Sequence, residues 1–182
     1  MKITGGQFQG RQVSYRERKG RRTTSEKVRM AVFNILGNMV DFENIKVVDL
    51  FAGSGMYGIE AISRGAGTVT FVDRDRGSIR DVKLAMETFG FTNYEVRSMS
   101  YDKFMAETKH ALSLQKYDLV FADPPYYDFD LQKIELVADI LAKDGVFVLE
   151  SSSRVAIPKI DILRLLEDRT YGDSHVAIWQ KI

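Results

Sequence analysis

Cysteine is absent from this chain of 182 residues, which excludes disulfide bonds, thiolate metal sites and thiol catalysis. Histidine is scarce: the chain has 2, His110 and His175, and neither has a carboxylate or a second histidine at the spacing of metal ligands. The sequence therefore predicts no metal site. The lack of cysteine also fits a cytoplasmic protein, where thiols are kept reduced and disulfides are rare.

Long hydrophobic runs are also missing. No apolar stretch approaches the about 18 residues that a membrane-spanning helix needs, and the N-terminus lacks the apolar core of a signal peptide. We therefore expect no contact with a membrane. A chain of this length with 45% hydrophobic residues predicts one domain, residues 1–182, with a sizeable core. The sequence does not determine the oligomeric state, and a monomer is the default expectation.

Acidic residues are nearly absent from the first 29 residues. This segment holds 9 Lys or Arg against Glu17 and Glu26, whereas the remainder of the chain holds 17 basic and 23 acidic residues. Such a segment is often a solvated tail. Here it contains the turn signals Gly5-Gly6 and Gly10 and runs directly into a predicted helix, which favours contact with a polyanion such as nucleic acid.

The hydrophobic pattern predicts alternating strands and helices, with a short hairpin over Lys2–Val13 at the start and a charged loop over Tyr15–Arg22. Strands that alternate with helices of about 10–15 residues indicate an α/β fold, a mostly parallel Rossmann-like sheet with helices on both faces. The expected helices are Ser25–Met39 with Thr24-Ser25 as N-cap, Ile59–Ser63, Asp75–Phe89, Asp102–Leu114 and Leu131–Leu141. The seven expected strands are Lys46–Leu50, Thr68–Val72, Tyr94–Arg97, Tyr117–Ala122, Gly145–Glu150, Ile160–Leu166 and His175–Ile182.

Three acidic residues stand at the carboxyl ends of predicted strands: Asp49, Asp73 and Asp123. In open parallel sheets ligands bind at this edge, where the strand order reverses. A single acid there is often a turn residue, but three acids that end three strands indicate one cleft.

A glycine loop follows the first strand. Gly53-Ser-Gly55-Met-Tyr-Gly58 matches G-x-G-x-x-G, and Asp73 lies 20 residues after Gly53, the fingerprint of dinucleotide-binding proteins. The same geometry serves any adenosine cofactor whose ribose needs a carboxylate. Asp49 would be repelled by a pyrophosphate and attracted by the ammonium of a methionine group. The site therefore favours S-adenosylmethionine over a nicotinamide cofactor.

Proline is rare, and two of the 3 prolines are adjacent, in Asp123-Pro-Pro-Tyr126. Proline has no N–H for the sheet ladder, so this segment makes a rigid exit from the fourth strand. A turn at the strand end is the plain interpretation. The combination of an acid, two prolines and an aromatic residue at the ligand edge points more strongly to function.

At these residues the chain resembles a family. Asp-Pro-Pro-Tyr is similar to the catalytic motif of class I methyltransferases that modify amino groups of bases. The wider set resembles the bacterial 16S ribosomal RNA guanine-N2 methyltransferase family. That set is Gly5–Arg11, Thr24-Ser25, Val28-Arg29, Phe33–Leu36, Asp49–Gly55, Gly58–Ala61, Ser63–Ala66, Phe71–Asp75 and Asp123–Tyr126.

The resemblance implies a methyltransferase fold and a set of roles. S-adenosylmethionine would donate the methyl group and leave as S-adenosylhomocysteine, and the substrate would be ribosomal RNA in an assembled or partly assembled small subunit. Asp123 and the Pro124 carbonyl would accept the N–H bonds of the amine, and Tyr126 would stack on the base. The cofactor would contact Asp49, Phe51, Gly53, Gly55, Asp73, Arg74, Ser100 and Tyr101, and phosphates would contact Arg11, Lys19, Arg21, Arg22 and Arg29.

The chain departs from the family pattern at two places. Thr23 replaces the usual proline before the first helix, and Ser100-Tyr101 stand where an acid commonly lies near the adenine. Arg29 could equally be structural. Three alternatives stay open: an amino methyltransferase acting on adenine or on a protein amide, a nicotinamide-dependent oxidoreductase, and an RNA-binding module without catalytic activity.

Overall fold

The computed structural model describes residues 1–16, 25–110, 116–125 and 129–182. Within them, the strands form one seven-stranded sheet in the order β3-β2-β1-β4-β5-β7-β6. Only β7 runs antiparallel to the others, because β5 and β6 both pair with it antiparallel. This confirms the mostly parallel sheet. The strands are β1 (Lys46–Leu50), β2 (Thr68–Asp73), β3 (Tyr94–Ser98), β4 (Tyr117–Ala122), β5 (Leu141–Ser152), β6 (Leu163–Tyr171) and β7 (Ser174–Lys181).

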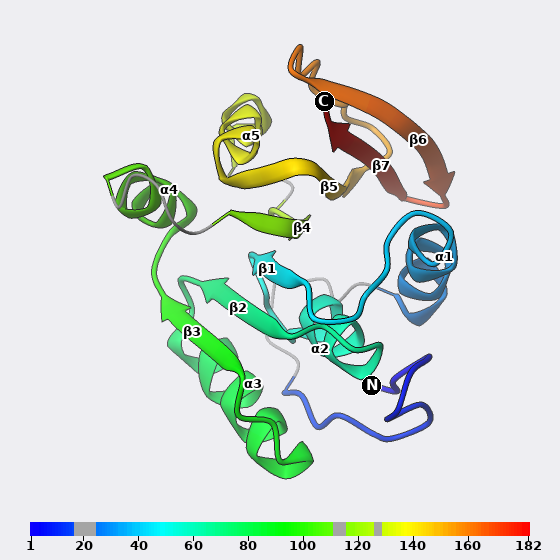
Figure 1. The fold of residues 1–182 in the computed structure, drawn as a ribbon, viewed down its shortest axis with the longest axis vertical. Coiled ribbons are helices and arrows are strands. Elements are labelled where there is room, and N and C mark those ends of the chain that lie inside the picture. The colour runs from blue at the N-terminus through cyan, green and yellow to red at the C-terminus, as the bar shows by residue number, and fades with distance from the viewer. Residues whose placement is uncertain (17–24, 111–115, 126–128) are drawn as a thin grey trace.

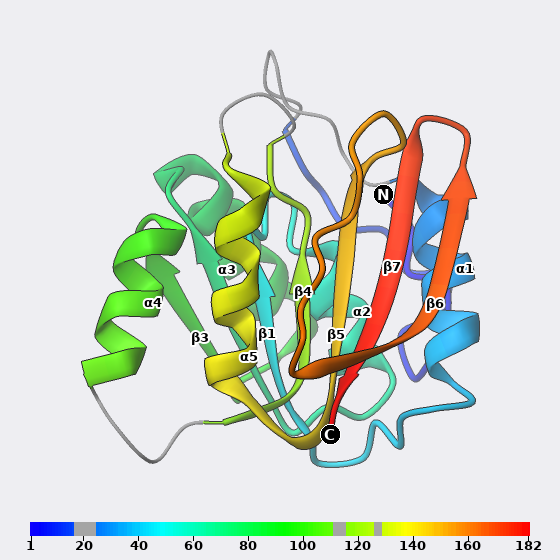
Figure 2. The same ribbon diagram turned by 90° about the horizontal axis from the view of Figure 1, so that it is seen from above.

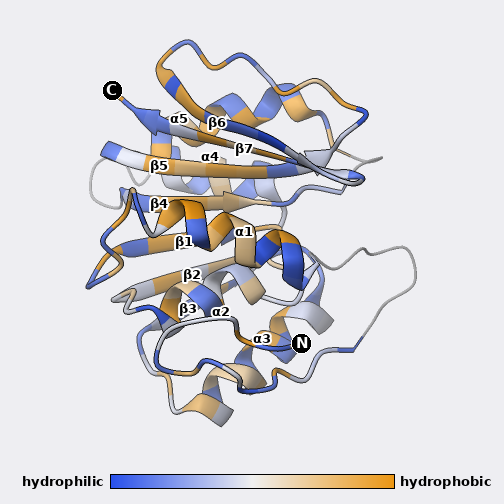
Figure 3. Ribbon diagram, turned by 90° about the vertical axis from the view of Figure 1, so that its right-hand side faces the viewer, coloured by the Kyte–Doolittle hydropathy of each residue, from blue (hydrophilic) through white to orange (hydrophobic). Residues whose placement is uncertain are grey.

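The helices cover both faces of the sheet. Figure 1 shows α4 and α5 on one side, and α1, α2 and α3 on the other. A separate apolar cluster lies under each layer. Hydrophobic residues run along the central strands β1, β4 and β5 (Figure 3), as expected for parallel strands that are buried on both faces. The helices are α1 (Glu26–Leu36), α2 (Met56–Ser63), α3 (Arg76–Phe89), α4 (Tyr101–His110), the 3₁₀ segment η1 (Leu131–Leu136) and α5 (Val137–Ile140).

Local signals in the sequence explain where α1 and α3 begin and end. Ser25 is the N-cap of α1, and its side chain accepts a hydrogen bond from the Val28 N–H at 3.1 Å, as the sequence predicts. The helix ends at Leu36 and not near Met39. The N–H of Gly37 then bonds to carbonyls of the last turn. Asp75 caps α3 in the same way, and Gly90 ends it in the left-handed conformation at φ 70°.

The second half of the chain departs most from the expected elements. The predicted helix over Leu131–Leu141 is a 3₁₀ segment followed by a four-residue α-helix, and β5 already begins at Leu141. The strand expected over Ile160–Leu166 is β6, which begins at Leu163 and continues to Tyr171. The reason is pairing: β6 lies antiparallel to the full length of β7, and this partner cannot be read from local periodicity.

The N-terminal hairpin is present, but its two arms share a single β-bridge, Lys2↔Gln12. It packs against the C-terminal end of α2, where the Gln7 N–H donates to the Ser63 carbonyl at 2.6 Å. A Cβ on Gly6, which has φ +78°, would lie 1.8 Å from that carbonyl oxygen. Glycine is therefore required for this approach. Ile3 and Val13 are buried, so the hairpin is part of the hydrophobic core.

Candidate active site

The corner after β4 and the glycine loop after β1 lie at the same edge of the sheet. The two strands are parallel neighbours, and Leu50 is paired with Ala122. Asp123 follows Ala122 directly and is half-buried, and Pro124 is buried. Figure 2 shows the carboxyl ends of the parallel strands at one edge. Tyr126 lies outside the described residues.

The glycine loop is tied to the end of β2. Phe51 and Gly53 have φ of 59° and 54°, and Gly55, the N-cap of α2, has φ 73°. The Gly53 N–H donates to Asp73 Oδ2 at 2.8 Å. A positive φ is strained for a side chain such as that of Phe51. The hydrogen bond to Asp73 therefore holds the loop beside the ends of β1 and β2.

Asp49 is a buried carboxyl group under this loop. The Gly58 N–H donates to Asp49 Oδ2 at 3.0 Å, and only 3% of the residue is exposed. Burial, reinforced by the nearby charge of Asp73, raises the pKa of Asp49 to about 8, although the hydrogen bond from Gly58 opposes the shift. A carboxyl group in such a place favours a cationic neighbour, which would stabilise its charged form.

Asp73, at the end of β2, organises the loops around it. Its Oδ1 accepts the Asp75 N–H at 2.7 Å, and its Oδ2 accepts the Gly53 N–H. Each carboxylate oxygen offers two acceptor positions, so a ribose hydroxyl can bond to the same group. Arg74, which follows it, is exposed.

Ser100 and Tyr101 play different parts at the start of α4. Ser100 is exposed, and its Oγ accepts the Lys103 N–H at 3.3 Å. Tyr101 is buried and donates its hydroxyl to the Lys133 carbonyl at 2.8 Å. Burial raises the pKa of this phenol. Its ring stacks on Phe51 with centroids 5.4 Å apart, and Phe129 meets both rings edge-on. Tyr101 thus borders the glycine loop through its ring.

Sequence reasoning missed a polar group behind Asp123. Glu150, near the end of β5, is buried and accepts hydrogen bonds from the Tyr57 hydroxyl at 2.9 Å and the Ser174 hydroxyl at 2.8 Å. Burial, followed by the charges of Glu150 and Asp123, raises the pKa of Tyr57 well above its ordinary value. Tyr57 is therefore a fixed hydrogen-bond donor. The strand-end rule that selected Asp123 would also have selected Glu150.

The basic residues proposed to hold RNA fall into three groups. Lys19, Arg21 and Arg22 lie outside the described residues. Arg11 is exposed, and its guanidinium lies over the Phe89 ring at 4.6 Å, at the end of α3 far from the carboxyl edge.

Arg29 requires a correction, because it is 0% exposed. Its Nε donates to Glu60 at 3.1 Å and its Nη2 to the Lys2 carbonyl at 2.6 Å. Glu60 also accepts the Thr4 N–H at 2.6 Å and pairs with Arg64. Arg29 therefore joins α1, α2 and the hairpin in the interior, and the expected phosphate contact at this position is wrong.

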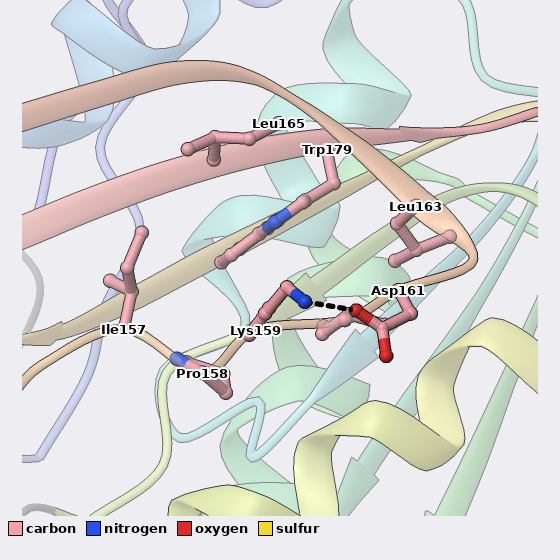
Figure 4. A pocket seen from close by; sticks show the side chains of 8 residues that line it. Ile157, Pro158, Lys159, Asp161, Leu163, Leu165 and Trp179 are labelled. Atoms are coloured by element: carbon pink, nitrogen blue, oxygen red, sulfur yellow. Dashed lines mark ion pairs between the residues drawn. The ribbon is translucent and has the colours of Figure 1, made fainter.

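A hollow in the surface lies away from this edge. It has a volume of about 330 Å³ and is lined by residues 157–161 with Leu163, Leu165 and Trp179 (Figure 4). Its one ion pair, Lys159–Asp161 at 2.8 Å, is highly exposed. The hollow offers no convergent polar groups, which ligand sites normally provide.

Across residues 1–16, 25–110, 116–125 and 129–182, no group of three or more His, Cys, Asp or Glu side chains could hold a metal ion. In the same residues, no helix is both long and apolar enough to span a membrane.

Comparison with known proteins identifies relatives of the whole chain. The family model described as "Conserved hypothetical protein 95" matches residues 1–180. The candidate rRNA methyltransferase YlbH of Bacillus subtilis is 33% identical over 100% of this chain and 99% of its own length. Ribosomal RNA small subunit methyltransferase D of Escherichia coli K12 is 30% identical over 88% of this chain and 79% of its own length.

Solved structures agree with these relatives. The candidate methyltransferase yhhF from Escherichia coli superimposes with a TM-score of 0.85 at 26% identity, covering 100% of this chain and 97% of that one. The 16S rRNA N2 G1207 methyltransferase RsmC of Thermus thermophilus, solved with AdoMet and guanosine, shares the fold at a TM-score of 0.67 and 18% identity, over 87% of this chain and 44% of its own. The chain therefore belongs to the Conserved hypothetical protein 95 family, the family of the methyltransferase D proteins of small-subunit ribosomal RNA.

Proposed function

We propose that this protein methylates ribosomal RNA of the small subunit, using S-adenosylmethionine to modify the exocyclic N2 amine of a guanine. One observation carries the proposal: the Asp123-Pro124 corner and the glycine loop leave neighbouring parallel strands at the same edge. A methyl donor in the loop would then lie beside the groups that hold the amine. Family membership supports the ribosomal substrate.

Asp123 and Pro124 would prepare the amine for attack. The nitrogen of guanine N2 is a poor nucleophile because its lone pair is delocalised into the ring. The Asp123 carboxylate and the Pro124 carbonyl would accept its two N–H bonds and draw the nitrogen toward tetrahedral geometry. Both acceptors also stabilise the positive charge that develops on the nitrogen, so they act more strongly in the transition state than before it. Asp123 or water then accepts the proton.

The residues around the loop fit S-adenosylmethionine. The buried carboxyl group of Asp49 favours the cationic methionine end, Asp73 can accept hydrogen bonds from ribose hydroxyls, and the Tyr101 and Phe51 rings border the adenosine side. The sulfonium of this cofactor supplies a methyl group that is already activated. The task of the protein is then to hold the reacting atoms in line, about 3 Å apart.

The RNA substrate must present its target base outside a helix, because a stacked and paired base cannot enter this edge. The basic segment over residues 1–22 is expected to hold phosphates, with Lys19, Arg21 and Arg22 as its central cations. Among the residues that the structure describes, one sheet and its helices make up the fold, without a second domain to search for a site. We therefore expect an assembled or partly assembled small subunit to be a better substrate than free RNA.

The test is transfer of labelled methyl groups from S-adenosylmethionine to small subunits isolated from cells that lack the enzyme. Nucleosides from the digested RNA should contain labelled N2-methylguanosine at one position. Labelled N6-methyladenosine would overturn the choice of base, and absence of label from both subunits and free ribosomal RNA would overturn the ribosomal substrate.

An Asp123→Asn variant provides the matched control. It keeps the size of the side chain but replaces one acceptor oxygen with a donor, so it should transfer methyl groups far more slowly. Its affinity for S-adenosylmethionine, measured by calorimetry, should stay near that of the wild type.

A further inference from the structure

The outer face of α3 carries a row of cations that the site described above does not use. Arg76, Arg80 and Lys83 are all exposed and follow one another at spacings of four and three residues, which places them on one face of a helix. A neighbouring face of the helix packs into the core through Ile79, Val82 and Met86. Glu87, one turn beyond Lys83, shares the exposed face and ends the row.

This arrangement is unfavourable for an isolated helix. Cations near a helix N-terminus oppose the helix dipole, and like charges four residues apart repel each other. The first turn of α3 contains no acidic residue to offset them, apart from the Asp75 cap that precedes it. Among the residues that the structure describes, none forms an ion pair with Arg76, Arg80 or Lys83. A bound polyanion would attract each of these cations and so offset the repulsions.

The row begins at the active edge. α3 starts three residues after Asp73, the acid at the end of β2, and runs back along the sheet beside the outer strands (Figure 1). With about 1.5 Å of rise per residue, the eight residues from Arg76 to Lys83 span about 10 Å. The cations thus extend from the candidate active site along the side of the molecule.

We propose that this face of α3 binds the phosphate backbone of the RNA substrate next to the target nucleotide. The inference rests on the proposed function and adds a contact surface outside the basic segment over residues 1–22. Charge complementarity selects a polyanion as the occupant, because residues 30–182 together carry more acidic than basic side chains and yet three cations gather here. Such contacts are independent of sequence and position the RNA, while the edge residues select the base.

The experiment compares wild-type protein with a triple variant, Arg76→Gln, Arg80→Gln and Lys83→Gln. Binding of transcribed small-subunit ribosomal RNA is measured across a range of salt concentrations. A plot of log affinity against log salt concentration has a negative slope. Each lost phosphate contact should make that slope less steep by about 0.7–0.9, so the slope of the triple variant should be less steep by about 2–3. A Lys109→Gln variant, on the exposed side of α4 across the sheet, should keep the wild-type slope.

Thermal stability separates this role from a structural one. Removing cations that repel one another and oppose the helix dipole should leave the melting temperature unchanged or raise it. A wild-type slope in the triple variant would overturn the proposal, and so would an equal loss in the Lys109 variant.

Methylation measured on the same samples keeps the two proposals apart. Wild-type protein that binds RNA through α3 but transfers no methyl group would overturn the proposed function and leave the surface standing. Methylation with an unchanged salt slope in the triple variant would overturn only the surface.

Discussion

Asp49 makes the stability of this protein depend on pH in a direction opposite to that of a salt-bridged carboxylate. Burial raises its pKa from 3.8 to about 8. Between these two values the unfolded chain has lost the proton that the folded protein still holds. The free energy of unfolding therefore falls as pH rises through this window, by about 1.4 kcal/mol per pH unit from this group. The stabilising contribution is complete below about pH 4 and is lost above about pH 8.

An Asp49→Asn variant isolates this contribution. Asparagine has the same size, and its carbonyl oxygen can still accept the Gly58 N–H. The asparagine amide does not titrate in this range, so residue 49 no longer stabilises the folded state at low pH relative to high pH. Across the whole window the free energy of unfolding of the variant, relative to that of the wild type, should rise by roughly 6 kcal/mol, a large fraction of the stability of an ordinary domain.

The assay is urea unfolding of both proteins at pH 5, 6, 7 and 8, about one unit apart. The free energy of unfolding of the variant minus that of the wild type is plotted against pH. All other titrating groups are common to both proteins and cancel in the difference. A line that rises by about 1.4 kcal/mol per unit supports the buried, protonated carboxyl group. A flat difference would show that Asp49 is already ionised at pH 5 and would refute the reasoning.

Three other predictions address the site and the hairpin. Asp123→Ala should lower methyl transfer by about 10²–10³-fold or more, with affinity for S-adenosylmethionine nearly intact by calorimetry; joint loss of both would make the residue structural. Replacing Lys19, Arg21 and Arg22 by alanine should lower the salt slope of RNA binding by about 2–3, and an unchanged slope would remove them from the phosphate contacts. Arg29→Met should cost about 1–3 kcal/mol in urea unfolding, because it removes the buried hydrogen bonds to Glu60 and to the Lys2 carbonyl, while Arg64 stays paired with Glu60; a wild-type midpoint would mean that these buried hydrogen bonds contribute nothing.

Point substitutions are the proper test of the basic segment. Removing residues 1–22 would also remove Ile3 and Val13, which are 0% and 3% exposed. It would further expose Glu60, to which the Thr4 N–H donates. A loss of RNA binding after truncation would then report unfolding of the core as much as loss of cations.

Much of the active edge could be predicted from local patterns. The strands that carry Asp49, Asp73 and Asp123 are short apolar runs, and each acid falls at or next to the carboxyl end of its strand. Parallel pairing then brings the ends together without further information. Glu150 follows the same rule in β5, but no motif surrounds it to indicate a function.

Other features could not be read from the chain. Arg29 and Arg11 both belong to a basic segment, yet one lies in the interior against Glu60 and the other on the surface over Phe89. Tyr101 stands where a cofactor contact was expected, and its hydroxyl is committed to the Lys133 carbonyl, 32 residues away. The burial and the contacts of these side chains depend on partners that are distant in sequence.

The sequence by itself determined the order of strands and helices, the acids at the strand ends and the glycine loop, because periodicity, capping and backbone freedom act over a few neighbouring residues. Only the tertiary structure decided which charges are buried and which are exposed. It placed Arg29 in the core, raised the pKa of Asp49 and left Arg76, Arg80 and Lys83 exposed on one face of α3. The physical reason is that desolvation and charge pairing depend on what packs around a group, and packing joins segments that lie far apart along the chain.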